Sequence, residues 1–140
     1  MPETSTGVGL PKPAPRLIRT ARDAELAAAD WMVYLGFRNV SVSAMGPDAG
    51  IDIHSLEAVA QVKAEVEPTG QPKVQQLHGA AASAGKSGIF FALAGYTSPA
   101  RTDADGNGIA LFQFNLRGEA EPTNHAAHEL SRASTSSPRG

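Results

Sequence analysis

The sequence predicts one α/β domain built on a mixed central β-sheet with helices on both faces, in the order α-β-β-β-α-β-α-β. Three observations predict this class. Two short alternating segments, 51–54 and 59–65, are close enough in sequence to form a hairpin. The run GIFFALA at 88–94 is continuously apolar, as in a central strand covered on both faces. Helical patterns separate this run from the hairpin and from a last strand at 109–115.

The first helix begins after Thr20, because Asp23 completes a variant of the capping box in which Asp replaces Glu. The helix continues through AELAAADWMVYL, and Gly36 ends it. Residues 37–43 then alternate between apolar and polar side chains, which predicts a strand. The segment MGPDAG at 45–50 has the Gly and Pro residues of a turn.

The hairpin carries polar side chains where a packed sheet normally has apolar ones. Because successive side chains of a strand point to opposite faces, we expect Ile51 and Ile53 on one face and Asp52 on the other. In the next strand, Gln61 and Lys63 share a face. If the register places Asp52 beside them, the three polar groups converge, because cross-strand neighbours lie ~5 Å apart at Cβ.

Two more helices complete the pattern. The second begins at Pro72 and ends at Gly85. Ser98 and Pro99 start a short third helix, which is expected to end at the DGNG loop of 105–108. The positions of the second helix that are expected to face inward are Val74, Leu77 and Ala81.

Both ends of the chain are interpreted as tails. Residues 1–18 are rich in Pro and Gly and predict a disordered tail, and the Ser-rich residues 119–140 predict a flexible one. The central part of the chain, residues 19–118, is therefore expected to hold the whole folded domain.

Composition excludes several classes of protein. The 140 residues carry a formal net charge of −2, so global charge does not indicate a nucleic-acid binder. The absence of cysteine excludes disulfides, thiolate catalysis and Cys-type zinc sites. No apolar run approaches the ~20 residues of a membrane span, and the N-terminal residues lack the apolar core of a secretory signal. We therefore expect a cytoplasmic protein without a membrane partner.

The polar hairpin residues suit a hard cation. The carboxylate of Asp52 and the amide oxygen of Gln61 are ligands that Mg²⁺ or Mn²⁺ prefers, and the backbone carbonyl of Val62 can join them. Such a metal polarises a phosphate, while the ammonium of Lys63 stabilises the negative charge that develops on it. The alternative is a satisfied Asp52–Lys63 ion pair on an exposed sheet face. The spacing alone leaves both interpretations open.

Two other motifs are rejected. GAAASAGKS at 79–87 looks like a phosphate-binding P-loop, but it has one residue too many and ends a helix instead of opening one. No nucleotide cofactor is expected. The segment 103–108 matches the first half of a calcium loop, but Phe114 occupies the position of the terminal Glu ligand.

The segments GPDAGIDI, AVAQVKAE, PTGQPKVQQLHGAA, GIFFALAGYTSPA and GIALFQF together resemble the Mrr-like restriction endonucleases of the PD-(D/E)XK nuclease superfamily. The resemblance covers Asp23 to Asn115 and includes the preceding helix. It implies a restriction-endonuclease-like core. A bare Asp…Gln-x-Lys pattern is unspecific, and its placement on a hairpin between two helices gives it weight.

The resemblance assigns roles by position. Asp52 matches the metal-binding aspartate, Gln61 the second metal-site residue and Lys63 the catalytic lysine. Glu25 matches an acidic residue of the first helix that adds a water-mediated metal contact; a helix-dipole role is an equal alternative. The sequence Pro47-Asp48 also matches the first two letters of the motif, but the resemblance favours Asp52 as the metal-binding aspartate and leaves Asp48 as a turn residue.

What the resemblance implies for activity is a magnesium-dependent deoxyribonuclease that cuts DNA to 5′-phosphate and 3′-hydroxyl ends. A double-strand break suggests a homodimer, since one site cuts one strand. Restriction is the first expectation, and a structure-specific or repair nuclease and an inactive DNA-binding module are the alternatives. The residues expected to contact DNA are Lys73, Gln75, Gln76, Lys86 and Arg101, with Gln75 and Gln76 equally readable as a solvated helix face.

Overall fold

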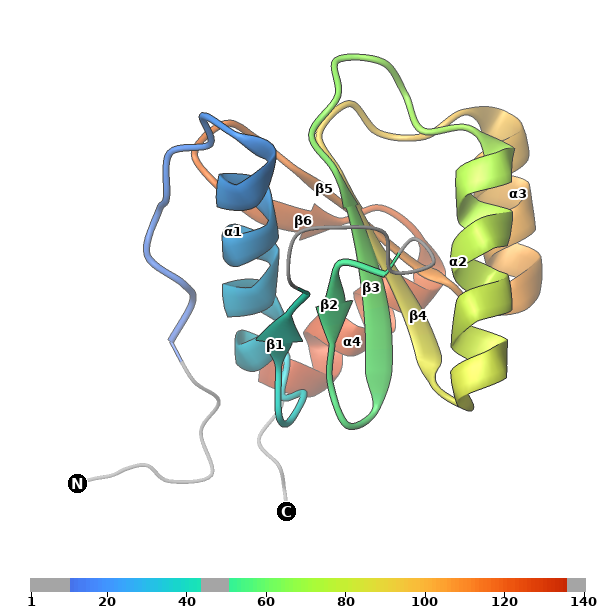
Figure 1. The fold of residues 1–140 in the computed structure, drawn as a ribbon, viewed down its shortest axis with the longest axis horizontal. Coiled ribbons are helices and arrows are strands. Elements are labelled where there is room, and N and C mark those ends of the chain that lie inside the picture. The colour runs from blue at the N-terminus through green and yellow to red at the C-terminus, as the bar shows by residue number, and fades with distance from the viewer. Residues whose placement is uncertain (1–10, 44–50, 136–140) are drawn as a thin grey trace.

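The computed structural model describes residues 11–43 and 51–135. In chain order these residues form helices and strands that follow the predicted sequence of elements and add two more at the C-terminal end (Figure 1). The elements are α1 (Ala21–Tyr34), β1 (Ser41–Val42), β2 (Ile53–His54), β3 (Ala58–Lys63), α2 (Gln71–Ala84), β4 (Ser87–Ala92), α3 (Ser98–Asn107), β5 (Ala110–Phe114), β6 (Ala120–Pro122) and α4 (His125–Thr135).

The strands form one mixed six-stranded sheet in the order β1-β2-β3-β4-β5-β6. The pairs β1–β2, β2–β3 and β5–β6 are antiparallel, while β3–β4 and β4–β5 are parallel. The antiparallel hairpin followed by helix-separated parallel strands is the predicted α/β architecture, which is confirmed.

Helices cover both faces of the sheet (Figure 1). On one face α1 and α4 pack against a cluster that includes Phe91 and Phe112, whose rings stack at 5.2 Å between centroids. On the other face α2 and α3 pack against Phe90 and Leu111. Neighbouring residues of β4 thus bury their side chains in opposite layers, which explains why GIFFALA is apolar without alternation.

The predicted helix ends are observed at α1 and α2. Thr20 caps α1, and its side chain and that of Asp23 satisfy each other's backbone N–H groups in a capping box. Gly85 ends α2 in a left-handed conformation with a φ of 66°, which a residue without Cβ adopts easily. The expected inward positions Val74, Leu77 and Ala81 are buried.

The expectation of a flexible tail from residue 119 onward is wrong for residues 120–135, which form β6 and α4. The buried side chain of Asn124 holds this segment on the sheet. Its Oδ1 accepts from the N–H of Leu111 at 2.9 Å and from the N–H of Ala127 at 3.1 Å, and its Nδ2 donates to the carbonyl of Ile109. Ala127 of α4 is buried in the core cluster, so a helix with few apolar residues still completes the core.

The expectation of a disordered N-terminal tail is also wrong for its last residues, 16–18. Residues 11–19 form no helix or strand, but the N–H of Ile18 donates to the carbonyl of Leu116 at 2.9 Å. The N–H of Arg16 donates to the carbonyl of Arg117 at the same distance. The segment 16–18 is therefore fixed against the loop that follows β5.

Three local expectations differ from the structure. The strand predicted over 37–43 is regular only at β1, and α3 extends through Asn107 instead of ending before the DGNG sequence. Ile51 and Ile53 do not share a face: Ile51 packs in the α2–α3 layer and Ile53 in the α1 layer. The reason is that Ile51 precedes β2, where the two-residue alternation begins.

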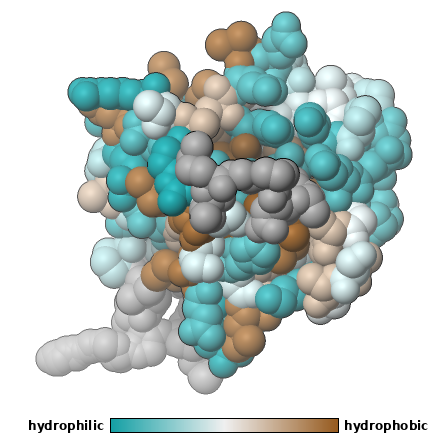
Figure 2. Space-filling view, viewed as in Figure 1, coloured by the Kyte–Doolittle hydropathy of each residue, from teal (hydrophilic) through white to brown (hydrophobic). Residues whose placement is uncertain are grey.

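Figure 2 shows hydrophilic and apolar side chains interspersed over the face seen in Figure 1.

None of the helices within the described ranges has the length and apolar character that crossing a membrane requires.

Candidate active site

A cleft of about 580 Å³ opens beside the C-terminal end of β3. It brings together the four side chains that the sequence singled out as the chemical centre, although they come from α1, the start of β2 and β3. The cleft is lined by Glu25, Asp52, Gln61, Val62 and Lys63, among others.

Asp52 is anchored on both sides by its own backbone. Its N–H donates to the carbonyl of Ala60 at 2.8 Å, and its carbonyl accepts from the N–H of Ser43 at 2.8 Å. The regular pairing of β2 with β3 ends at Ile53 opposite Ala60. The Asp52 N–H thus bonds the residue that lies opposite Ile53, so the regular register does not continue to Asp52, and the three polar groups meet through the cleft that they line.

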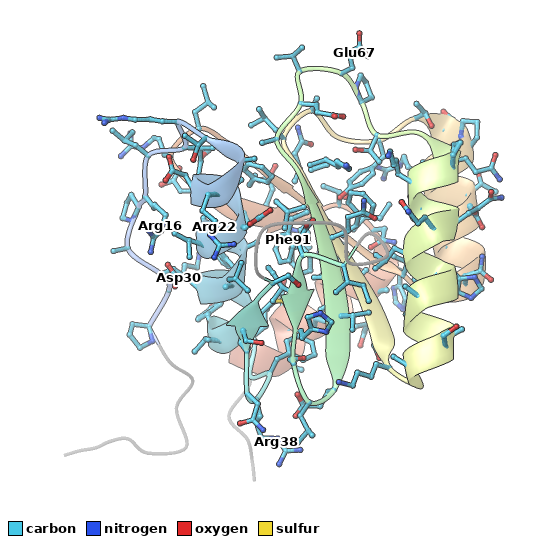
Figure 3. All side chains as sticks on the ribbon, viewed as in Figure 1. Arg16, Arg22, Asp30, Arg38, Glu67 and Phe91 are labelled. Atoms are coloured by element: carbon cyan, nitrogen blue, oxygen red, sulfur yellow. The ribbon has the colours of Figure 1, made fainter. Side chains whose placement is uncertain are left out.

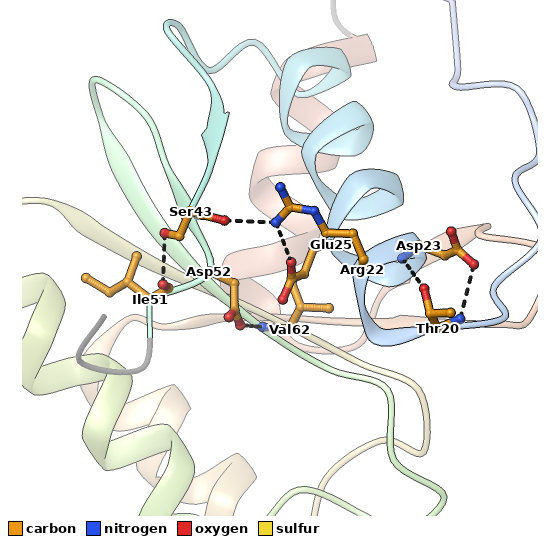
Figure 4. A network of polar contacts seen from close by, with 8 residues as sticks. All are labelled: Thr20, Arg22, Asp23, Glu25, Ser43, Ile51, Asp52 and Val62. Atoms are coloured by element: carbon orange, nitrogen blue, oxygen red, sulfur yellow. Dashed lines mark hydrogen bonds and ion pairs between the residues drawn. The ribbon is translucent and has the colours of Figure 1, made fainter. Parts of the chain in front are cut away.

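The carboxylate of Asp52 replaces a missing strand hydrogen bond. Its Oδ2 accepts from the backbone N–H of Val62 at 2.7 Å, beyond the point where β2 has left β3 (Figure 4). A charge-assisted bond of this length fixes the orientation of the carboxylate in the cleft. Within a strand, the N–H and C=O of one residue face the same edge, so the carbonyl of Val62 is directed toward the same side as this carboxylate.

Gln61 is buried, with 2% of its surface exposed, and its Oε1 has no hydrogen-bond partner among the described residues. An acceptor in this state carries a desolvation penalty of about 1–3 kcal/mol. Such atoms are rare in native proteins and call for an explanation, of which a bound ion is one. The orphaned oxygen belongs to a residue that lines the same cleft as Asp52.

Lys63 ends β3 and is partly buried in the cleft. Its ammonium forms no ion pair or hydrogen bond with any of residues 11–43 or 51–135, so the Asp52–Lys63 ion pair considered as the alternative is absent there. Because side chains alternate along a strand, Lys63 projects from the same face as Gln61. A cation without a counter-charge in a cleft is available to an anionic ligand.

Glu25 enters the cleft from the first turns of α1 and is held by Arg22. The Nη1 of Arg22 donates to Oε1 of Glu25 at 3.0 Å and to the backbone carbonyl of Ser43 at 2.8 Å (Figure 4). The Glu25 side chain is 21% exposed. Arg22 thus connects α1 to the end of β1 and sets the orientation of the second carboxylate that lines the cleft.

The donor set fits a hard divalent cation. One carboxylate, one orphaned amide oxygen and one backbone carbonyl are oxygen ligands of the kind that Mg²⁺ and Mn²⁺ take, with water filling the remaining positions. Within the described ranges no group of three His, Cys, Asp or Glu side chains is placed to hold a metal ion, so a cation in the cleft would depend on the amide oxygen, the backbone carbonyl and water for most of its ligands.

The residues expected to contact DNA divide into two groups. Lys73, Gln75 and Gln76 lie exposed on α2. Lys86 and Arg101 lie away from the cleft lining and use their side chains internally: Lys86 donates to the carbonyl of Ser55 and Arg101 to that of Thr123, both at 2.7 Å. Asp48 lies outside the described residues.

On the α1 side of the cleft, sequence reasoning identified Glu25 but missed Arg19 and Thr20, which also line it. The N–H of Arg19 donates to Asp23 at 2.9 Å, and this bond, together with those from Thr20, holds the pKa of the Asp23 carboxyl below its usual value of 3.8. The capping box at Thr20 was visible in the sequence, but its proximity to β3 was not.

A mixed sheet that presents Asp52, Gln61 and Lys63 in one cleft fits the architecture of a PD-(D/E)XK-type nuclease domain, and the family comparison assigns the chain to that class. A family model described as restriction endonuclease, the Mrr catalytic domain, matches residues 19–115, more than half of the chain. The chain belongs to this restriction endonuclease family. Searches of curated proteins and of solved structures found no match.

Proposed function

We propose that the protein is a metal-dependent DNA endonuclease of restriction, Mrr-like, type. The observation that carries the proposal is the buried Oε1 of Gln61, which has no hydrogen-bond partner among residues 11–43 and 51–135 and lies in a cleft shared with Asp52 and Lys63. Membership of the restriction endonuclease family supports phosphodiester hydrolysis as the reaction. The orphaned acceptor favours an active site over a retained but inactive fold, because a binding module gains nothing from a buried oxygen without a partner.

In this proposal Asp52, Gln61 and the carbonyl of Val62 hold Mg²⁺ or Mn²⁺. The bound cation would supply Lewis-acid polarisation of the scissile phosphate and a more acidic water. The Val62 N–H keeps the Asp52 carboxylate oriented at 2.7 Å, so no reorganisation of that ligand is needed when a cation binds.

Lys63 contributes the positive charge. Its ammonium, free of partners within the described residues, stabilises the additional negative charge on the phosphate and orients the attacking water. Glu25, whose Oε1 accepts from Arg22 at 3.0 Å, would accept a hydrogen bond from a water bound to the cation. The products of this hydrolysis are 5′-phosphate and 3′-hydroxyl ends.

Exposed residues of α2, namely Lys73, Gln75 and Gln76, are proposed to contact the DNA backbone outside the cleft. Lys86 and Arg101 contribute less, because their side chains already donate to backbone carbonyls. One cleft hydrolyses one strand, so a double-strand break requires two copies of the chain, which a homodimer would provide.

The proposal is tested by incubating the purified protein with supercoiled plasmid, methylated plasmid and branched DNA, each with Mg²⁺, Mn²⁺ or EDTA. Metal-dependent nicking of plasmid, abolished by EDTA, is expected. A strong preference for branched DNA would instead assign a structure-specific nuclease. Binding of DNA without cutting of any substrate under either metal would contradict the proposal and favour an inactive module.

A further inference from the structure

Two arginines, far apart in the sequence, lie on segments that border the cleft. Arg19 lines the cleft and precedes α1, while Arg117 follows Leu116, which also lines it. The backbone bonds that fix residues 16–18 against 116–117 bring the two arginine-bearing segments together. Both arginines are exposed.

Arg19 and Arg117 differ from the other arginines in having no partner for their side chains within residues 11–43 and 51–135. All remaining arginines of these ranges are engaged: Arg16 with Asp30, Arg22 with Glu25, Arg38 with Glu57, Arg101 with the carbonyl of Thr123, and Arg132 with Glu129. An exposed guanidinium without an internal partner is suited to bind a planar or tetrahedral oxyanion from outside.

The other side of the cleft has the opposite charge. Glu65 lines it, and Glu67 lies close by on the loop between β3 and α2, where Figure 3 shows it at the tip, directed away from the sheet. Both glutamates are exposed, and neither forms an ion pair with any described residue. Of the exposed charges without an ion-pair partner among the described residues, the arginines thus lie beside α1 and the glutamates on the β3–α2 loop, while Glu25 of α1 is paired with Arg22.

We propose that the DNA strand to be cut runs along the α1 side of the cleft, with its phosphates on Arg19 and Arg117. This inference rests on the proposed nuclease function and adds the path of the substrate. Guanidinium groups bind phosphate oxygens in bidentate fashion, and two unpaired glutamates repel a second run of phosphates.

Apolar groups support the same path. Leu17 and Leu116 belong to the same two segments as the arginines and are 61% and 59% exposed. Large apolar side chains at this exposure offer contact area to the deoxyribose and base edges between phosphates. The arginine-bearing segments thus match the alternating anionic and apolar surface of a nucleic-acid strand, and a protein partner would need no regular alternation of this kind.

Binding can be measured separately from cutting. A full-length Lys63→Ala protein, in Ca²⁺ to prevent cleavage, is titrated against a short fluorescein-labelled duplex at several salt concentrations. Adding Arg19→Ala or Arg117→Ala should weaken binding about three- to tenfold at low salt and reduce the slope of log affinity against log salt by about 1 each. Glu65→Gln with Glu67→Gln should strengthen binding about two- to fivefold.

Arg38→Ala serves as the matched control, because Arg38 is an exposed arginine paired with Glu57 at the far end of the molecule from Glu67 (Figure 3). It should leave the affinity unchanged. Equal affinity in the Arg19, Arg117 and Arg38 variants would overturn the inferred path, even if the wild-type protein cuts DNA. Conversely, an arginine-dependent affinity in a protein that cuts nothing would uphold the path and refute the nuclease proposal.

Discussion

The carboxylate of Asp52 and the backbone N–H of Val62 are joined by a 2.7 Å hydrogen bond where β2 leaves β3. The side chain takes the place of a strand partner that is no longer there. One interaction thus satisfies a buried backbone donor and aims a carboxylate into the cleft, so the same residue serves the fold and the proposed chemistry.

This dual role separates two substitutions of Asp52. Asp52→Asn keeps an oxygen that accepts from Val62 but removes the charge, so the free energy of unfolding should stay within about 1 kcal/mol of wild type while cleavage falls at least about 100-fold. Asp52→Ala leaves the donor unpaired and should destabilise by about 1–3 kcal/mol. Urea denaturation and plasmid nicking measure the two effects. Equal stability of both variants would contradict the assigned bond.

Replacing Gln61, whose Oε1 is buried without a partner among the described residues, is predicted not to destabilise the metal-free protein. Gln61→Met removes a buried acceptor that has no partner in the part of the chain that the structure describes, so the metal-free protein should be as stable as wild type or up to about 1–2 kcal/mol more stable. The same variant should lose any rise in Tm that Mn²⁺ gives the wild type.

Gln113 provides the control for Gln61, because its Nε2 donates to the carbonyl of Leu93 at 3.2 Å. Gln113→Met should lower stability and keep the Mn²⁺-dependent rise in Tm. If Gln61→Met instead destabilises the metal-free protein by more than Gln113→Met, then Oε1 has a partner in solution and the cation-site argument fails.

Arg22 is predicted to be a positioning residue for Glu25. Arg22→Met removes both of its bonds, to Glu25 and to the carbonyl of Ser43, and should lower the cleavage rate about tenfold at saturating DNA. The pair is partly exposed, so its stability contribution should not exceed about 1 kcal/mol. Arg38→Met, which breaks an exposed pair at the other end, should leave the rate unchanged. An unchanged rate in Arg22→Met as well would remove this role.

The buried hydroxyl of Tyr96 should make the free energy of unfolding depend on pH in the alkaline range. Its hydroxyl donates to the carbonyl of Phe112 at 2.6 Å, and burial raises the pKa of Tyr96 well above its usual value of 10.0. The neutral form is therefore favoured in the folded state, and its contribution is complete below pH 10 and declines as pH rises from there toward the folded-state pKa. Tyr96→Phe should cost about 1 kcal/mol at pH 8 and flatten the decline above pH 10. Parallel declines in both proteins would contradict the assignment.

Asn124 is predicted to hold the C-terminal helix. Asn124→Ala leaves the N–H of Leu111 and the carbonyl of Ile109 without partners in a buried setting, which should destabilise by about 2–4 kcal/mol. Asn107 is exposed and bonds only within α3, so Asn107→Ala should change stability by less than about 1 kcal/mol. A loss near zero for Asn124→Ala would restore the interpretation of residues 119–140 as a dispensable tail.

The hairpin and its polar residues were predictable because strand alternation and capping are local properties. Gln61 and Lys63 share a face of β3, together with Val59, because side chains two residues apart in a strand point to the same side. Thr20 and Asp23 form the capping box that the sequence predicts. The α4 segment was not predictable, because it buries little more than Ala127 and depends on Asn124, a polar residue whose importance comes from partners far away in sequence.

The chemical detail of the cleft required tertiary structure. The Asp52 carboxylate reaches the N–H of Val62 because the pairing of β2 with β3 stops at Ile53, and a sequence does not show where strand pairing stops. The contribution of Arg19 depends on residues 16–18 docking beside the loop after β5, a contact across nearly the whole domain.

The most direct test of the central claim is the rate of metal-dependent plasmid nicking by wild type and by Lys63→Ala, purified in parallel and compared in Mg²⁺, Mn²⁺ and EDTA. The account predicts that wild type nicks only with metal and that Lys63→Ala is slower by at least about 100-fold, with its thermal stability unchanged. Nicking that persists in Lys63→Ala at the wild-type rate would contradict the assignment of this cleft as the site of DNA hydrolysis.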